Sequence, residues 1–140
     1  MKNAMQPTGD QIKGFQSRTT GAPIFMLNLL KFRDRAKYED GRETSLSGKE
    51  AYALYSAGMQ KIIPALGGSF VFGGEVRGML IGEVADMWDA AAIVQYPDTA
   101  AMMGMMADPA YQEIHPHREA GLEGQLLIEC AKGFSLGSAA

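Results

Sequence analysis

Cysteine is almost absent from this chain, and its scarcity limits both the structure and the chemistry. Cys130 is the only cysteine among 140 residues, so no disulfide can form within the chain. A chain of this length buries enough apolar surface to fold without disulfides or metal ions. We therefore predict a single domain over 1–140 in a reducing compartment, with Cys130 as an inert thiol buried in an apolar strand.

Long apolar runs and a strong net charge are missing as well. No stretch is long enough to cross a bilayer, and the first ten residues lack the apolar core of a signal peptide. The formal net charge of −3 offers no basic surface to a nucleic-acid backbone or to an acidic membrane. These features predict a cytoplasmic protein that binds neither nucleic acid nor membrane.

The motifs of several enzyme classes are also missing. The chain has no Gly-x-Gly-x-x-Gly, no phosphate-binding loop, no Gly-x-Ser-x-Gly and no Cys-x-x-Cys. Nucleotide, dinucleotide and serine-hydrolase functions are therefore not supported. No cofactor is predicted.

What the chain does have is a segment, 23–32, that is typical of a strand buried on both faces. Successive side chains of a strand point to opposite sides. One side carries Ile24, Met26, Asn28, Leu30 and Phe32, and the other carries Phe25, Leu27, Leu29 and Lys31. Neither side suits open water, although an antiparallel sheet normally keeps one solvated face. Both faces of such a sheet must be packed against other parts of the protein or against another chain. A polar side chain buried on either face needs a hydrogen-bond partner or a ligand.

Capping boxes predict two helices. One begins at Thr8 and covers 8–18, with so thin an apolar stripe that we expect it to be an accessory element. The other begins after Ser47 and presents Tyr52 and Tyr55 on its buried face. Between the first strand and this helix, the charged segment 33–46 is expected to be a solvated connector first and a lid second.

The second half of the chain alternates strands with one further helix in two pieces. Its strands are predicted over 69–72, with pairing resumed over 76–81, and then over 87–96 and 125–131. Asp98 and Asp108 each begin one piece of the helix, and Pro116 is expected to kink or split the second piece. Residues 133–140 are expected to form a flexible tail.

This order of elements is the βαββαβ arrangement of a ferredoxin-like fold over 22–132, preceded by a helix. The fold class is α+β, with helices covering one face of a four-stranded antiparallel sheet. The strands carry apolar residues on the other face too. Two such sheets packed face to face would bury those residues, so we predict a homodimer.

Several short motifs, in this order and spacing, resemble those of the DUF1330 family over about 23–128. They are Asn-Leu-Leu-Lys-Phe at 28–32, Tyr52 and Tyr55, Gly67-Gly68, Trp88-Asp89, Tyr96-Pro97, Asp108-Pro109 with Tyr111, and His117-Arg118. The resemblance implies a dimeric α+β barrel. That superfamily includes small monooxygenases, isomerases and haem enzymes, so it assigns no reaction. Gln95 stands where relatives often carry a basic residue, which weakens the case for an anionic ligand.

The candidate catalytic residues are His115 and His117, because histidine titrates near neutrality and can exchange a proton. Exposed histidines are also common in a helix interrupted by proline. The chain has no third histidine to complete a metal site with them, and Cys130 is its only cysteine, so no metal is predicted.

The candidate ligand-binding residues each have a structural alternative. Asn28 either holds a carbonyl or oxyanion, or is a buried amide bonded to a neighbouring strand. Arg118 either orients a carboxylate or enolate, or anchors its helix. The others are Tyr52 and Tyr55, which are core residues or donors at a cavity rim, and Trp88 and Tyr96, which either seat a helix or wall an apolar pocket.

Two functions from different classes follow. The first is a protein that binds a small apolar or aromatic molecule, or a cofactor-independent enzyme of the isomerase or monooxygenase kind, with an apolar pocket in each half of a dimeric barrel. The second is a non-catalytic dimeric module whose barrel is filled by side chains. The volume and lining of the cavity discriminate between them.

Overall fold

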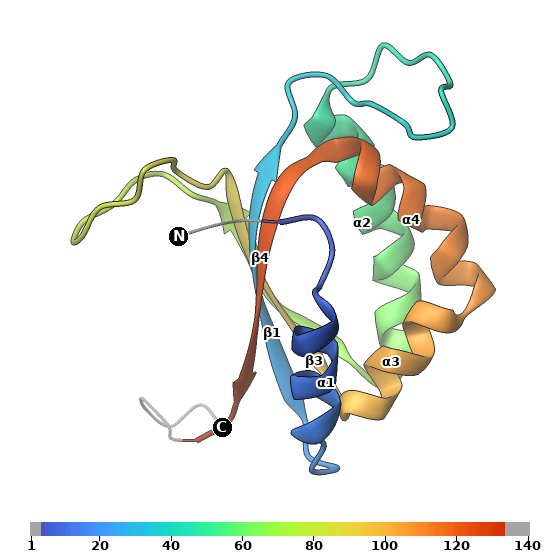
Figure 1. Ribbon diagram of the computed structural model, residues 1–140, viewed down its shortest axis with the longest axis vertical. Coiled ribbons are helices and arrows are strands. Elements are labelled where there is room, and N and C mark those ends of the chain that lie inside the picture. Colours follow the sequence, from blue (N-terminus) through green and yellow to red (C-terminus); the bar gives the residue numbers. More distant parts are fainter. Residues whose placement is uncertain (1–3, 134–140) are drawn as a thin grey trace.

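The computed structural model describes residues 4–133 and has the predicted ferredoxin-like architecture (Figure 1). Its elements are α1 (Gly9–Ser17), β1 (Ile24–Phe32), α2 (Gly48–Ala65), β2 (Ser69–Glu75), β3 (Ala90–Tyr96), α3 (Thr99–Ala107), α4 (Pro109–Gly121) and β4 (Leu122–Ala131). The strands form one antiparallel sheet in the order β2-β3-β1-β4. Helices α2, α3 and α4 lie on one side of it. The α+β fold class is therefore confirmed. The predicted tail beyond Gly133 lies outside the described residues.

The helix boundaries follow the capping signals. Thr8 and Ser47 both form complete capping boxes, and Gly67 ends the α2 segment with a φ of 83°. Asp108 caps α4, whose first residue is Pro109. Pro116 was expected to kink or split this segment. It does not split it, because α4 continues through that proline to Gly121. None of the helices within residues 4–133 is long and apolar enough to cross a membrane.

Two strand boundaries differ from the prediction. β2 runs through Gly73 and Gly74 to Glu75, and its register shifts earlier, between Phe70 and Phe72. Pairing does not resume over 76–81. β3 begins at Ala90, so Trp88 precedes the strand and the predicted start at residue 87 is too early. Between β2 and β3 the chain forms a long connection instead of extending the hairpin.

The main core lies between the sheet and α2. Ile24 and Met26 of β1 are buried in one cluster with Tyr55, Met59 and Ile63 of α2. These β1 residues belong to the side of the strand that also carries Asn28. We call this the inner face of the sheet. Burying these side chains supplies the main stabilisation of the fold.

The opposite, outer face of the sheet is apolar but has no helix over it among the described residues (Figure 1). The strand register places on it Phe25, Leu27, Leu29, Ile93, Leu126 and Ile128. Cys130 pairs with Phe25 on this face and is exposed, so the expectation of a buried thiol is wrong for the single chain. The 76–89 connection projects from the sheet and exposes 96% of Leu80 and 85% of Ile81.

The 33–46 connection is less solvated than predicted. Ala36 and Tyr38 are buried in a small second cluster with Ala51 and Ala120. The Lys37 amide donates a hydrogen bond to the Ala120 carbonyl oxygen, 3.0 Å away. The segment is therefore fastened to the end of α4.

The beginning of α2 and the end of α4 meet backbone to backbone. A Cβ on Gly121 would lie 2.5 Å from the Gly48 carbonyl oxygen and 2.8 Å from the Tyr52 nitrogen. A Cβ on Gly48 would lie 2.6 Å from the Gly121 carbonyl oxygen. Only glycine fits at either position, so these two residues fix the distance between the helices at this end.

Candidate functional site

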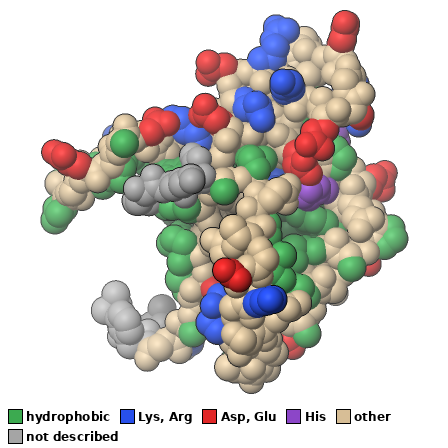
Figure 2. Space-filling model, in the orientation of Figure 1, with side chains coloured by type: hydrophobic (Ala, Val, Ile, Leu, Met, Phe, Trp, Pro, Cys, Tyr) green, Lys and Arg blue, Asp and Glu red, His purple; other side chains and the backbone are tan. Residues whose placement is uncertain are grey.

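A cavity of about 1210 Å³ lies between the inner face of the sheet and the helices. Its apolar walls include Met26, Met59, Val94, Met102 and Met105. Figure 2 shows hydrophobic side chains next to a histidine on the side of the molecule where the helices lie. A volume of this size accommodates a small organic molecule. The cavity is open to solvent in part, because exposed residues such as Ile12, Phe70 and Phe72 are among those that line it.

The N-terminal segment forms one wall of this cavity. Residues 4–7 and several residues of α1 line it, although α1 has no fully buried residue. The helix is held by an ion pair of 2.7 Å between Arg18 and Glu129 of β4. Ahead of it, Ala4 pairs with Gln125 through two backbone hydrogen bonds. The predicted accessory helix is thus part of the cavity.

Three polar side chains form a continuous chain of hydrogen bonds on the cavity wall. Arg118 Nη2 donates to Gln125 Oε1 at 2.6 Å, and Gln125 Nε2 donates to Asn28 Oδ1 at 2.7 Å. Asn28 Nδ2 donates in turn to the Met26 carbonyl oxygen at 3.1 Å. These bonds satisfy the Asn28 amide, which matches the structural alternative for that residue. They also orient the half-buried Arg118, whose Nη2 donates to the Met5 carbonyl oxygen at 3.0 Å.

Tyrosines from three elements gather in the cavity. Tyr52 and Tyr55 of α2, Tyr96 of β3 and Tyr111 of α4 line it, and the hydroxyls of Tyr55 and Tyr111 are 3.3 Å apart. Burial raises the pKa of Tyr52 to about 12, and it also raises the pKa of Tyr55 and Tyr96. The hydroxyls of Tyr52, Tyr55 and Tyr96 are therefore neutral at physiological pH. Tyr55 donates to the Tyr111 hydroxyl, whereas Tyr52 and Tyr96 can donate hydrogen bonds to a ligand.

His115 is the histidine that lines the cavity. Its Nδ1 lies 2.8 Å from Glu119 Oε1, one turn further along α4. Burial lowers the pKa of His115, a change that the Glu119 carboxylate opposes and the Arg118 guanidinium reinforces. A neutral imidazole held by a carboxylate can accept a proton from a bound molecule.

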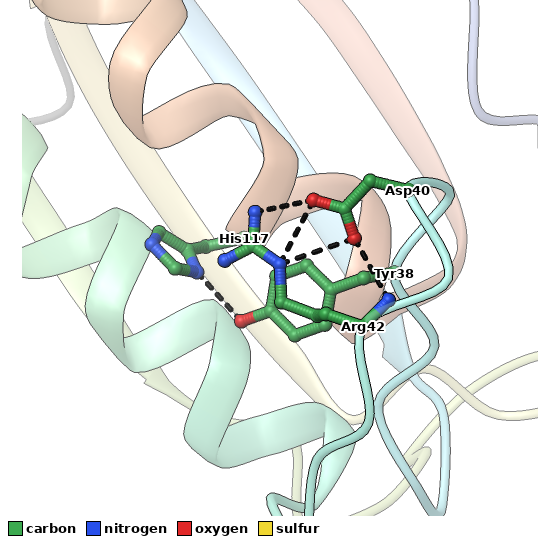
Figure 3. A network of polar contacts seen from close by, with 4 residues as sticks. All are labelled: Tyr38, Asp40, Arg42 and His117. Carbon is green, nitrogen blue, oxygen red and sulfur yellow. Dashed lines mark hydrogen bonds and ion pairs between the residues drawn. The ribbon is translucent and has the colours of Figure 1, made fainter.

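His117 lies apart from the cavity. Its Nδ1 is 2.6 Å from the Tyr38 hydroxyl, on the 33–46 connection (Figure 3). The Arg42 guanidinium stacks on the Tyr38 ring at 4.4 Å and pairs with Asp40. Burial and the positive charge of Arg42 lower the pKa of His117. No residue of 33–46 lines the cavity, so this connection does not act as its lid.

The structure therefore brings together six of the eight predicted site residues. The cavity is lined by Asn28, Tyr52, Tyr55, Tyr96, His115 and Arg118. His117 and Trp88 do not line it; Trp88 is buried ahead of β3, and its indole N–H has no protein partner among the described residues. Their proposed roles in a site stay predictions. Within residues 4–133, no group of three or more His, Cys, Asp or Glu side chains is arranged to hold a metal ion.

Gln125 and Tyr111 are among the cavity residues that the sequence did not indicate. Gln125 links Arg118 to Asn28, and Tyr111 contacts Tyr55. Gln125 had a visible signal, because it is a polar residue directly before the apolar run Leu126 to Ile128. Its partners depend on the strand register, which the sequence did not specify.

These features define an α+β protein of ferredoxin-like fold with a large cavity between sheet and helices. The chain belongs to the DUF1330 family, a domain of unknown function, whose model matches residues 42–129. RPA0582, a protein of unknown function from Rhodopseudomonas palustris, is similar over nearly the full chain. Its crystal structure is 36% identical, covers 92% of this chain and 96% of its own, and has a TM-score of 0.81. The methylated form is 39% identical, covers 99% and 100%, and has a TM-score of 0.85.

More distant structures share only the fold. A dimeric ferredoxin-like protein of unknown function from Jannaschia sp. CCS1 is 11% identical, with a TM-score of 0.52 over 79% of this chain and 99% of its own. A hydroxynitrile lyase from Passiflora edulis is 15% identical, with a TM-score of 0.53 over 83% and 100%. No curated protein was found to match the chain.

Proposed function

We propose that this protein binds a small apolar or aromatic molecule in the cavity between its sheet and its helices. The observation that carries the proposal is the cavity itself, whose volume is about 1210 Å³. Its walls are mostly apolar and include the hydrogen-bonded side chains of Arg118, Gln125 and Asn28. Apolar walls with a few fixed polar groups are the usual composition of a ligand site. The alternative of a module filled by side chains is less favoured, because the space within one chain is open.

The chemistry that fits this site is proton transfer without a cofactor. His115 is the candidate base, since it lines the cavity and its lowered pKa keeps the imidazole neutral. The neighbouring tyrosine hydroxyls are neutral donors that could hold a developing oxyanion. Isomerase-like and monooxygenase-like reactions of an activated carbon acid both begin with loss of a proton, so the same residues serve either.

We also propose that two chains associate through the outer faces of their sheets. These faces are apolar in the single chain, and the exposed Leu80 and Ile81 project from the sheet on the 76–89 connection. The connection carries hydrophobic side chains at its far end (Figure 2). The Jannaschia protein of the same fold is described as dimeric, which supports this arrangement. The homodimer would place the cavities outside the interface, one in each chain.

The binding proposal is tested by filling the cavity. Ala92 lies on the inner face and lines the cavity, whereas Ala57 is exposed on α2. We expect Ala92→Phe to weaken binding of 1-naphthoate, measured by isothermal titration calorimetry, because the added ring takes up space in the cavity beside Asn28, with which Ala92 is paired. Ala57→Phe introduces the same ring outside it and should bind like the parent chain. Equal binding by both variants, or no binding of any aromatic probe by the parent, would contradict the proposal.

A further inference from the structure

Arg118 is the charged group in the cavity whose charge is not balanced by a carboxylate. Of the cavity's two arginines, Arg18 pairs with Glu129 at 2.7 Å. Arg118 forms no ion pair with any residue of 4–133, and its hydrogen bonds go to the neutral oxygens of Met5 and Gln125. Glu119, the carboxylate next in sequence, pairs with His115 instead. A half-buried cation among apolar walls is therefore left without a counter-charge.

The guanidinium also keeps unused donors. Both of its hydrogen bonds to described residues come from Nη2, so Nε and Nη1 have no protein acceptor there. A guanidinium has five N–H groups in a planar fork that matches two carboxylate oxygens. Leaving such a charge half-buried without an anion is unfavourable, and an anionic ligand would offset that cost.

We infer that Arg118 binds the anionic oxygens of a ligand with an apolar or aromatic body, such as an aromatic carboxylate or enolate. The inference rests on the proposed function, because it assigns the chemical class of the molecule that fills the same cavity. The head group lies at the Arg118 fork, within reach of the Tyr52 and His115 side of the cavity. The body lies against the methionines and Val94.

Gln95 stands where relatives often carry a basic residue, but this difference does not argue against an anionic ligand at Arg118. Gln95 pairs with Phe25 of β1, so its side chain belongs to the outer face of the sheet, and it accepts a hydrogen bond from the Ser69 hydroxyl. It does not line the cavity. The remaining acidic groups on the cavity wall are Glu129, which Arg18 neutralises, and Asp10 on the exposed helix α1.

The test compares two probes of nearly the same shape, 1-naphthoate and the neutral 1-naphthamide, by calorimetry at neutral pH. The parent chain should bind the carboxylate roughly tenfold more tightly or better, the ratio expected for charge-assisted hydrogen bonds at a half-buried site. Arg118→Gln should remove that preference, because it weakens carboxylate binding far more than amide binding. Arg118→Lys keeps the charge without the fork and should give an intermediate ratio, which covers the case in which Arg118→Gln does not fold.

Arg33→Gln is the matched control. Arg33 also donates to a backbone carbonyl, that of Leu122, but it lies outside the cavity, so its replacement should keep the preference of the parent chain. Equal affinity of the parent for both probes would overturn the assignment of Arg118 and leave the binding proposal intact. Retention of the preference by Arg118→Gln would overturn that assignment as well. Failure of both probes to bind would refute the proposed function and this inference together.

Discussion

At the scale of single residues, cavity tyrosines also belong to the main core. Tyr55 and Tyr111 are buried in the main core, yet both line the cavity with their hydroxyls. Their rings supply apolar contact area and their hydroxyls supply hydrogen-bond donors. The sequence left open a core role or a site role for Tyr52 and Tyr55. Burial of Tyr55 in the core does not exclude the site role that we propose for it.

The tyrosines make a prediction about alkaline pH. The unfolded chain loses phenolic protons near the ordinary value of 10.0, whereas folded Tyr52 keeps its proton up to about 12. The folded state therefore binds more protons in this range. The contribution of Tyr52 to stability is constant below about pH 10 and falls as pH rises toward 12. Each such tyrosine lowers the free energy of unfolding by at most about 1.4 kcal/mol per pH unit. Urea midpoints measured across this range should fall accordingly.

Tyr52→Phe provides the comparison for that titration. The variant lacks one of the shifted groups, so its stability should fall less steeply between pH 10 and 12 than that of the parent. Parallel curves for the two proteins would show that Tyr52 ionises in the folded state as readily as in the unfolded chain.

The sequence indicated several of the polar residues that line the cavity, but it did not indicate which of them lie next to one another. His115 and Arg118 are three apart on one helix, so they share a face, whereas His117 is two positions from His115 and points elsewhere. The spacing alone indicated that His115 and Arg118 lie on one face of the helix. The kink or split expected at Pro116 made that inference unsafe. The link from Asn28 through Gln125 to Arg118 spans three elements and depends on the register of β4 against β1. Local patterns carry no information on such a register.

At the scale of elements, the contact between α2 and α4 places two glycines where no other residue fits. We expect Gly121→Ala to lower the free energy of unfolding by about 1–3 kcal/mol or more, as overpacking does, because its Cβ would meet backbone atoms that cannot move aside. Chemical denaturation measures the change.

Gly104→Ala is the control for this prediction. Gly104 lies within α3, and a Cβ there would meet nothing within 4 Å. Alanine is the better helix former by about 0.5–1 kcal/mol, so this variant should be slightly more stable than the parent chain. A Gly121→Ala protein as stable as the parent would show that the two helices can separate at little cost.

The element boundaries that the sequence missed have local causes. Met87 and Trp88 are apolar, so alternation extended the predicted third strand over them, although Trp88 is buried outside the sheet. The role of α1 was missed because its apolar stripe is thin. Its place depends on the ion pair of Arg18 with Glu129, a residue 111 positions away. In contrast, both capping boxes identified their helices correctly, because capping is a local interaction.

At the scale of the whole molecule, the uncovered sheet face is the surface through which we propose that two chains associate. Leu27 lies at the middle of β1 on the outer face, and Leu54 is exposed on α2, away from that face. We expect the parent chain to be dimeric by light scattering and Leu27→Lys to be monomeric, because a buried unpaired charge opposes association. Leu54→Lys makes the same change on a helix and should remain dimeric. A monomeric parent chain would refute the proposed association.

The backbone contact of Gly48 with Gly121 also bears on which ligands the proposed binding cavity would accept. It joins α2 and α4 beyond Arg118, so the cavity has a constant width where we place the anionic group. The cavity is lined elsewhere by Met102, Met103, Met105 and Met106 of α3, whose flexible side chains change shape at low cost. The part of the cavity near Arg118 is thus expected to accept one size of head group, whereas the part lined by methionines is expected to adapt to ligands of different shape. If the proposed ligand class is right, we expect the protein to bind a series of homologous acids that share one head group and differ in the length or branching of the remainder.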